Sequence, residues 1–357
     1  MEQKPFFSVV MPIYGVEAYL RKAIESVLNQ TFQDFEILLV NDCSPDNSAA
    51  ICEEFSARYD NIRTLTHEVN QGLSAARNTG FSQVRGDYVW FMDSDDYVDP
   101  DLFEKVYQSL CKNKAQVVVF GCAEEYYDKN GQCVKTVPMC PNEAYCSTPA
   151  EVRRRVLELE IGTFYGYAWN KFYSVEHIRR HQLTYENVVL IEDIKFNVAF
   201  FDDVASMNVL PMTPYHYAKR GTTSLTSKFV PAYYAVHRER IHLLYEQQTR
   251  WGTADDGVKG TLAAIYTRYI FSALSRNCDK RAAMTHADRK AFLQGVFGDP
   301  MFNELIDAVR PEGALLKLMA AVLKKRSVLG GLFLGRLIYL VQTKLQRLFI
   351  WAKQARK

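Results

Sequence analysis

The amino-acid sequence predicts an α/β fold, a mostly parallel sheet flanked by helices, with a C-terminal helical extension. Over the first 122 residues, short runs rich in Val, Ile, Leu and aromatic residues alternate with amphipathic segments, as in parallel strands joined by helices. From Pro231 onward the pattern becomes predominantly helical. The 357 residues are 48% apolar, which is enough for one large core or two domains.

Five strands are expected in the first part of the chain, at residues 7–14, 35–41, 62–66, 88–92 and 116–121. Between the first two, a helix over residues 17–30 has apolar side chains at the spacing that buries one face. Asn47 or Ser48 is positioned to cap the next helix. A later amphipathic segment, residues 102–110, follows an acidic stretch that favours a helix start.

The parallel pattern is expected to end at Asn130-Gly131, which is typical of a tight hairpin turn. Residues 148–225 then mix helix and strand, and the helical part contains two long apolar-periodic stretches, residues 234–245 and 258–274. The predicted organisation is a catalytic domain over 1–225, with halves at 1–122 and 123–225, a helical extension over 226–312 and a tail over 313–357.

The cysteines indicate the cellular compartment, and the distribution of charge indicates the kind of partner. The eight cysteines include no Cys-x-x-Cys pair, and the N-terminus lacks the pattern of a secretory signal, so a reduced, cytoplasmic location is expected. Net charge is only +2, yet residues 313–357 hold ten Lys or Arg and no Asp or Glu. This favours an anionic membrane surface over nucleic acid, because the body has no basic cluster with interleaved aromatics.

The tail has the pattern of an amphipathic helix. Its expected apolar face comprises Leu334, Ile338, Val341, Leu345, Leu348, Phe349 and Ala352. The uninterrupted apolar run 328–335 is far shorter than the roughly 20 residues that span a bilayer, so an interfacial helix is expected on the inner face of the cell membrane. Docking on the catalytic domain or on a dimer partner is the alternative.

Ligands of open α/β sheets bind beyond the carboxyl ends of the strands, so the residues there are the first candidates for chemistry. The first strand ends at Pro12 and Tyr14, and the tyrosine can flank a base. Asp42, after the second strand, can accept hydrogen bonds from a uracil edge or can simply form a turn or cap. Arg77 follows a loop at residues 70–72 and can reach anionic oxygens or lie on the helix surface.

Asp93, Asp95 and Asp96 follow an apolar strand directly. Three carboxylates within four residues are costly without a cation or hydrogen-bond donors. Asp93 and Asp95 can present oxygens to one Mg²⁺ or Mn²⁺, which would bridge a diphosphate and stabilise the departing nucleotide. A helix start is the alternative, because acidic residues favour helix N-termini.

Two later segments are further candidates. Glu192 and Asp193 follow an apolar run and open a helix-like segment, so one of them can be a general base or both can be capping residues. A loop near Gly221 gathers the possible metal ligand His216 with Lys219 and Arg220. It is expected either to face a diphosphate or to be a plain surface loop.

In their order along the chain, five motifs resemble those of family 2 glycosyltransferases with the GT-A fold. They are residues 8–14, 40–42, 70–72 with 76–78, 92–96, and 192–193. The resemblance covers the first 225 residues. It implies a nucleotide-sugar site formed by Pro12, Tyr14, Asp42, Asn70, Arg77, Asp93, Ser94, Lys219 and Arg220, and metal ligands among Asp93, Asp95 and His216.

The resemblance also implies that Asp193 is the catalytic base with Glu192 beside it, and that Asp96, Trp169 and Lys171 line the acceptor side. An inverting, single-displacement transfer from a UDP-sugar to a glycan or lipid-linked glycan is then expected. The alternatives are a sugar-phosphate nucleotidyltransferase, although no Gly-rich signature loop follows the first strand, and a non-catalytic nucleotide-sugar-binding module.

Overall fold

The structure is a computed structural model that describes residues 4–344 except 189, 221–229 and 231. The chain divides into two compact units, residues 1–228 and 229–357. The finer boundaries expected at 122, 225 and 312 stay predictions.

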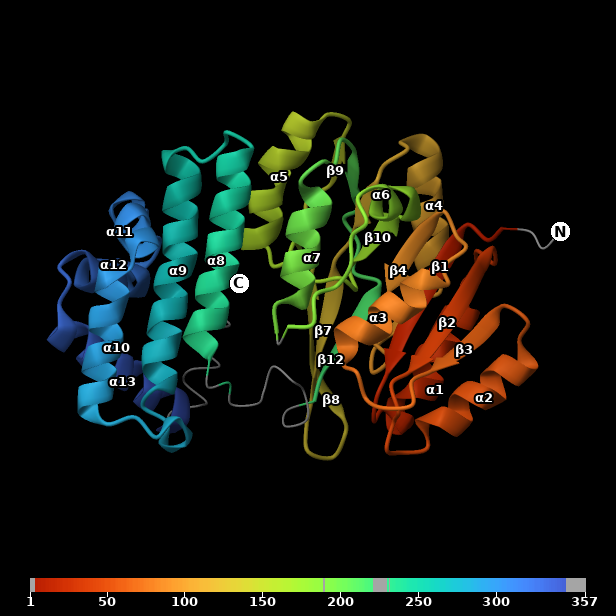
Figure 1. Cartoon of the computed structure of the whole chain (residues 1–357), viewed down its shortest axis with the longest axis horizontal. Helices are drawn as coiled ribbons and strands as arrows, with labels where there is room; N and C mark the ends of the chain where they lie inside the picture. The colour runs from red at the N-terminus through yellow and green to blue at the C-terminus, as the bar shows by residue number, and fades with distance from the viewer. Residues whose placement is uncertain (1–3, 189, 221–229, 231, 345–357) are drawn as a thin grey trace. The chain divides into compact units, whose positions relative to one another are not determined.

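The first unit is built on a large mixed sheet with the strand order β3-β2-β1-β4-β10-β6-β11-β9 (Figure 1). Its strands are β1 (Phe7–Ile13), β2 (Phe35–Asn41), β3 (Ile62–Thr66), β4 (Tyr88–Phe91), β6 (Val117–Val119), β9 (Ala144–Cys146), β10 (Lys171–Ser174) and β11 (Met207–Val209). The five predicted strands are confirmed, with the last one shorter than expected. β1 to β4 are parallel, but β10 runs antiparallel between β4 and β6.

Helices cover both faces of this sheet. They are α1 (Glu17–Leu28), α2 (Ser48–Arg58), α3 (Leu73–Ser82), α4 (Leu102–Lys112), α5 (Pro149–Ile161), α6 (Val175–Arg180) and α7 (Glu192–Phe201). The predicted helices at 17–30 and 102–110 are confirmed with small shifts at their C-terminal ends. At the expected cap Asn47 makes no capping hydrogen bond, and instead Asp46 accepts from the Ser48 and Glu17 amides at 3.1 and 2.9 Å.

The strands are buried on both faces, which is why they read as continuous apolar runs rather than alternating ones. Phe7, Val9 and Met11 face a core shared with α1, α2 and α4. On the opposite face α3 lies very close to the sheet, because a Cβ at Gly80 would come within 2.4 Å of Val10 Cγ1. Only glycine permits this approach, which places α3 directly over the carboxyl ends of β1 and β2.

A smaller sheet, in the order β5-β12-β7-β8, carries the predicted hairpin. Its strands are β5 (Tyr97–Val98), β7 (Cys122–Tyr127), β8 (Cys133–Met139) and β12 (Tyr215–Lys219). β7 and β8 pair antiparallel, and Gly131 in the turn has φ +75°, so the hairpin prediction is confirmed. β5 and β12 bring residues 97–98 beside residues 215–216.

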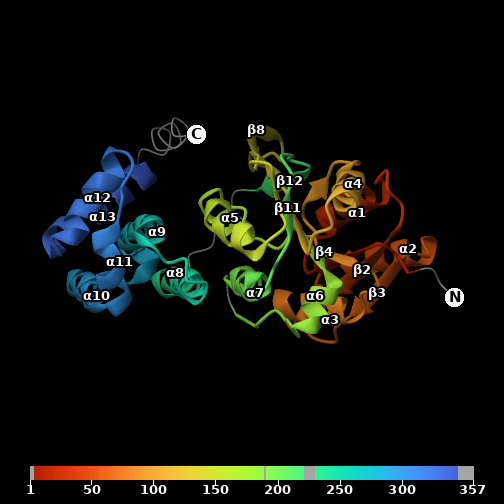
Figure 2. The same ribbon diagram turned by 90° about the horizontal axis from the view of Figure 1, so that it is seen from above.

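The second unit is helical, as predicted (Figure 2). Its elements are α8 (Tyr233–Arg250), α9 (Asp256–Arg276), η2 (Lys280–Ala282), α10 (His286–Gly298), α11 (Pro300–Leu305), η3 (Ile306–Ala308), α12 (Ala314–Lys324) and α13 (Val328–Lys344). The expected apolar face of the tail turns inward where it is described, because Leu334 is buried and Ile338 packs against the core of this unit. The other five residues of that face are Val341, which is half-buried, and Leu345, Leu348, Phe349 and Ala352, which lie outside the described residues. Of the helices that the structure describes, none is long and apolar enough to cross a membrane.

Candidate active site

The loop after β4, residues 92–96, is called the acidic loop because it contains three aspartates. It is fixed to the end of β1. The Ser94 hydroxyl donates to the Pro12 carbonyl at 2.7 Å, and both residues are buried. The loop turns the side chains of Asp93 and Asp95 outward, where they are 30% and 46% exposed. Two of the three residues predicted as metal ligands are therefore the accessible carboxylates of this loop.

Arg77 is the centre of the site. Its side chain is 2% exposed, and it reaches Asp93 Oδ1 at 3.2 Å, Asp193 Oδ1 and, at 3.9 Å, Glu192 Oε1. Burial alone would lower the pKa of Arg77, but these carboxylates raise it, so the guanidinium stays charged. One buried cation thus joins the loop after β4 to the start of α7. These acids are separated by about a hundred residues in the sequence.

Tyr185 covers the guanidinium of Arg77, with its ring centroid 5.1 Å from Cζ, and stacks on Phe196 at 4.2 Å. Asn78 holds it there through paired 2.8 Å bonds to the Tyr185 backbone. Within the described residues, Arg77 Nε, Tyr185 Oη and Glu192 Oε2 are buried without a hydrogen-bond partner. Polar atoms are thus left available beside the acids, a feature typical of a ligand site.

Asp193, the predicted base, lies in the first turn of α7 and is oriented from two sides. Arg77 binds Oδ1, and the Ala168 amide donates to Oδ2 at 3.0 Å. Its side chain is 17% exposed, so water or an acceptor can reach it. For its neighbour Glu192, burial and then the charge of Asp193 raise the pKa.

Lys171 does not face an acceptor, which differs from the expectation. The side chain is fully buried, and Nζ donates to the carbonyls of Phe164 and Tyr167 and to Asn170 Oδ1 at 2.6–2.8 Å. All three ammonium hydrogens are thus accounted for within the loop that precedes β10. Lys171 shapes the loop whose Ala168 amide holds Asp193.

Trp169 belongs to an aromatic stack beside the site. It lies 4.4 Å from Tyr215, 4.9 Å from Tyr167 and 5.6 Å from Tyr217, with ring planes within 27° of parallel. Trp169 itself is 4% exposed, whereas Tyr167 is 37% exposed. Tyr167 is therefore accessible to a ligand, and the buried ring of Trp169 packs against it.

Asp42 is engaged within the protein. Its carboxylate accepts from His67 Nδ1 at 2.7 Å and from the Gln71 and Gly72 amides at 2.8 Å each, and it is 3% exposed. It therefore organises the loop before α3, and direct base recognition stays a prediction. The adjacent Asn70 is exposed.

Tyr14 is 52% exposed just beyond the end of β1. Pro12 lies within β1 itself, fully enclosed in the strand. Of the two residues expected to hold the base, Tyr14 thus offers a ring surface and Pro12 only fixes the strand end.

Asp96, which was expected on the acceptor side, is buried and engaged within the protein. It accepts from Tyr215 Oη and from the Ala218 amide, both at 2.8 Å, and is 2% exposed. Burial, followed by the charges of Asp95 and Asp93, raises its pKa well above the ordinary value. Asp96 ties β12 to the acidic loop.

His216 does not join the acidic loop as a metal ligand. Its Nδ1 contacts Glu125 at 2.9 Å, its Nε2 contacts Asp99 at 3.0 Å, and its ring stacks on Tyr97 at 4.3 Å. Both ring nitrogens are therefore committed to other carboxylates. Across the ranges that the structure describes, no group of three or more His, Cys, Asp or Glu side chains is placed to hold a metal.

The two cations of β12 and the following loop differ in position. Arg220 lies 3.4 Å from Asp95, and its guanidinium covers the Tyr19 ring at 3.8 Å. Lys219 pairs with Glu124 at 2.6 Å, on the small sheet. Of these two cations, Arg220 therefore contacts the acidic loop, and Lys219 pairs instead with a residue of β7.

The acidic loop carries more negative charge than its cations balance. The pKa of Asp93 is raised to about 7, because burial and the charges of Asp95 and Asp193 together outweigh the opposing effect of Arg77. Burial likewise raises the pKa of Asp95, against Arg220. Two accessible carboxylates with an excess of negative charge suit a hard divalent cation, which proteins often bind through one or two carboxylates plus a phosphate.

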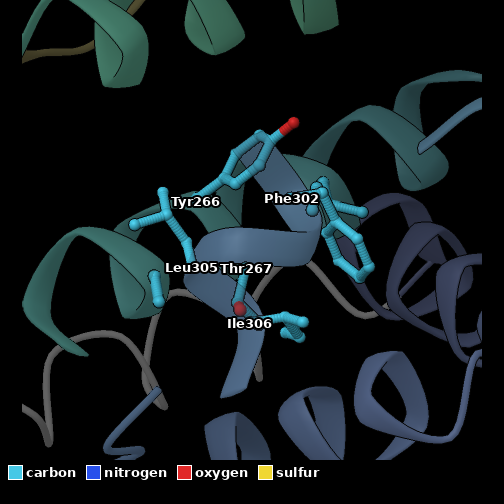
Figure 3. A pocket seen from close by; sticks show the side chains of 7 residues that line it. Tyr266, Thr267, Phe302, Leu305 and Ile306 are labelled. Atoms are coloured by element: carbon cyan, nitrogen blue, oxygen red, sulfur yellow. The ribbon is translucent and has the colours of Figure 1, made fainter. Parts of the chain in front are cut away.

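A narrow apolar cleft in the second unit is unrelated to these groups (Figure 3). It is lined by α9, α11 and η3 residues such as Thr267, Phe302 and Ile306, and the labelled side chains include no charged group. Nothing in this lining matches a nucleotide diphosphate.

Sequence reasoning did not assign four residues of the site: His67, Tyr167, Tyr185 and Tyr217. His67, Tyr167 and Tyr185 lie in irregular segments. Tyr217 had a signal, since it is two positions after Tyr215 and therefore on the same face of β12.

The parallel strands β1 to β4, the loop that follows β4 and the helices on both faces of the sheet are the elements of a GT-A fold. The family described as Glycosyl transferase family 2 matches residues 8–178. The first unit is thus similar to glycosyltransferase family 2 over these residues.

Curated relatives agree with this assignment. The uncharacterized glycosyltransferase EpsJ of Bacillus subtilis (strain 168) is 32% identical over 229 residues, 64% of this chain and 65% of EpsJ. The minor teichoic acid biosynthesis protein GgaB of the same organism is 43% identical over 122 residues, 33% of this chain and 14% of GgaB. The chain thus spans less than two thirds of the length of these relatives.

A solved structure supports the fold over most of the chain. The crystal structure of S. aureus TarS 1-349 in complex with UDP-GlcNAc has a TM-score of 0.61 to this protein at 18% identity. The match covers 92% of this chain and 90% of that chain. At this identity the likeness concerns the fold.

Proposed function

We propose that the protein is an inverting glycosyltransferase that moves a sugar from a nucleotide-sugar to a hydroxyl of a glycan or lipid-linked glycan. The observation that carries the proposal is the Arg77 network, which brings Asp93 and the candidate base Asp193 together. Donor-side and acceptor-side groups thereby share one oriented site.

In the proposed reaction, the acceptor oxygen attacks the anomeric carbon while the bond to the nucleotide diphosphate breaks. Asp193 accepts the proton of the attacking hydroxyl, and a single displacement inverts the configuration. Arg77 and the Ala168 amide hold the carboxylate in a fixed orientation, which lowers the entropic cost of reaching the transition state. A protein nucleophile is not required.

UDP is the proposed nucleotide. Support comes from the fold shared with TarS, whose crystal structures include complexes with UDP and UDP-GlcNAc. Tyr14 offers an exposed ring near the end of β1, and Arg220 beside Asp95 is available to neutralise phosphate charge. The donor sugar itself is left open by these groups.

Asp93 and Asp95 are the proposed ligands of Mn²⁺ or Mg²⁺. Their carboxylate oxygens and their exposure fit such an ion. A bound divalent cation would supply charge stabilisation to the departing diphosphate.

The proposed setting is cell-surface polymer assembly at the inner face of the cell membrane. Its support is the relative named for minor teichoic acid biosynthesis, together with the basic tail. Acceptors of this kind carry a lipid, so the enzyme is expected to work as a peripheral protein.

A screen of UDP-sugars for UDP release tests the activity, with Mn²⁺, Mg²⁺ or EDTA and with glycan or polyprenyl-linked acceptors. One UDP-sugar is expected to give metal-dependent release that acceptor stimulates. Pyrophosphate release from UTP and a sugar phosphate would instead identify a nucleotidyltransferase. Donor binding without release on any acceptor would identify a binding module.

A further inference from the structure

One face of α13 carries a stripe of exposed apolar side chains. Leu329, Phe333 and Leu337 recur every four residues and are 79%, 72% and 44% exposed. Residues four apart share a face of a helix, so the three side chains form one stripe about 12 Å long. Large apolar side chains that gather in this way mark a contact surface.

This stripe differs from the face that the sequence pattern predicted. Leu334 is 4% exposed and belongs to the core of the second unit. A Cβ at Gly331 would lie 2.5 Å from Leu293, and one at Gly335 would lie 2.7 Å from Leu274. The glycine side of α13 is therefore pressed against α9 and α10, and the fold does not need the stripe.

An exposed basic residue, Arg336, adjoins the stripe. Arg326, which precedes the stripe, is exposed as well, but its guanidinium donates to Asn303 Oδ1 at 2.7 Å and to the Phe297 carbonyl at 3.5 Å. Residues 313–357 hold ten Lys or Arg and no acidic residue. Two copies of such a face would repel each other, whereas an anionic lipid surface attracts it. Charge complementarity thus favours lipid over a second copy of the chain.

We propose that Leu329, Phe333 and Leu337 insert into the interfacial layer of an anionic membrane, with α13 lying in the membrane plane and Arg336 at the headgroups. The inference deepens the proposed function, since it rests on an enzyme that works at a membrane. Vesicle binding needs neither donor nor turnover, so the two proposals fail separately.

The test is flotation of the full-length protein with vesicles of 30 mol% phosphatidylglycerol in phosphatidylcholine, and with pure phosphatidylcholine vesicles. The variant is Leu329→Ser with Phe333→Ser. The matched control is Val134→Ser with Ile161→Ser, because these residues are 65% and 58% exposed in the first unit. All four side chains are exposed, so folding should be retained and is checked by circular dichroism.

The wild-type protein and the control are expected to bind anionic vesicles at least tenfold more strongly than the α13 variant, and pure phosphatidylcholine weakly. UDP release in vesicle-free solution should be equal in all three. Equal vesicle binding by the α13 variant and the control would overturn the proposal. So would a wild-type dimer, seen by light scattering, that the α13 variant converts to a monomer without any change in vesicle binding.

Discussion

At the residue scale, Arg77 determines how the site is assembled. It is a buried cation with carboxylate partners from two distant segments, and its planar fork allows it to bind both at once. The motif at residues 70–72 and 76–78 made Arg77 a candidate site residue from the sequence alone. Its partners could not be predicted, because an ion pair across more than a hundred residues depends on how α7 packs over α3.

Arg77→Lys tests this role. A lysine has no planar fork and cannot reproduce the geometry in which Arg77 holds Asp93 and Asp193, so kcat/KM for transfer should fall about 100-fold, roughly 2.7 kcal/mol in transition-state stabilisation. Arg63→Lys is the control, since Arg63 also binds a buried carboxylate, Glu36, away from the site. Steady-state UDP release compares them. Wild-type activity in Arg77→Lys would contradict the assigned role.

His177 gives a pH-dependent prediction. Its Nδ1 faces Gln116 Nε2, whose amide oxygen accepts from the Ala205 and Ser206 amides, so His177 must accept there and remain neutral. Burial lowers the pKa of His177 below its ordinary 6.5. The unfolded chain therefore binds the proton more readily, and stability falls as pH drops below about 6.5.

Thermal unfolding of wild type and His177→Gln between pH 7.5 and 5.5 measures this effect. The wild-type Tm should fall more steeply on acidification than the Tm of the variant. Parallel pH profiles would show that His177 is not the group responsible.

At the element scale, the loop between α5 and β10 positions the Asp193 carboxylate through the Ala168 amide. The sequence predicted the parallel strands, the flanking helices and the hairpin, because each has a strong local pattern. It did not predict that β10 enters the sheet antiparallel, since four residues carry too little periodicity. The burial of Lys171 was missed for a different reason, which is that lysine is ordinarily exposed.

Lys171→Met should release this loop. Met fills the space of the lysine stem but leaves buried carbonyl oxygens without their donor, which costs about 2–4 kcal/mol of unfolding free energy. Lys195→Met is the control, because Lys195 forms a partly exposed pair with Glu186 that contributes little. Urea unfolding measures both. Equal stability of the two variants would be inconsistent with the assigned contacts.

At the scale of the whole molecule, the candidate site and the helical core belong to separate compact units. The site residues described above all lie in the first unit, and the sequence predicted a helical part after it. The packing of α12 and α13 into the second unit was not predicted, because an amphipathic face has the same pattern whether it meets lipid or protein.

Phe271→Ala tests this separation. Phe271 is fully buried in the core of the second unit, so its truncation should cost about 3–5 kcal/mol. The affinity for UDP, measured by calorimetry below the unfolding transition, should stay within twofold of wild type. Phe172→Ala, in the core of the first unit, should instead weaken it. Equal loss of UDP binding in both variants would contradict the separation.

The central claim is that Asp193 is the base of a glycosyl transfer, and Asp193→Asn tests it most directly. The amide keeps the size of the side chain but cannot take the proton, so transfer should fall by at least about 100-fold. UDP binding, measured by calorimetry, should remain within a few-fold of wild type. Full turnover by Asp193→Asn would contradict the account.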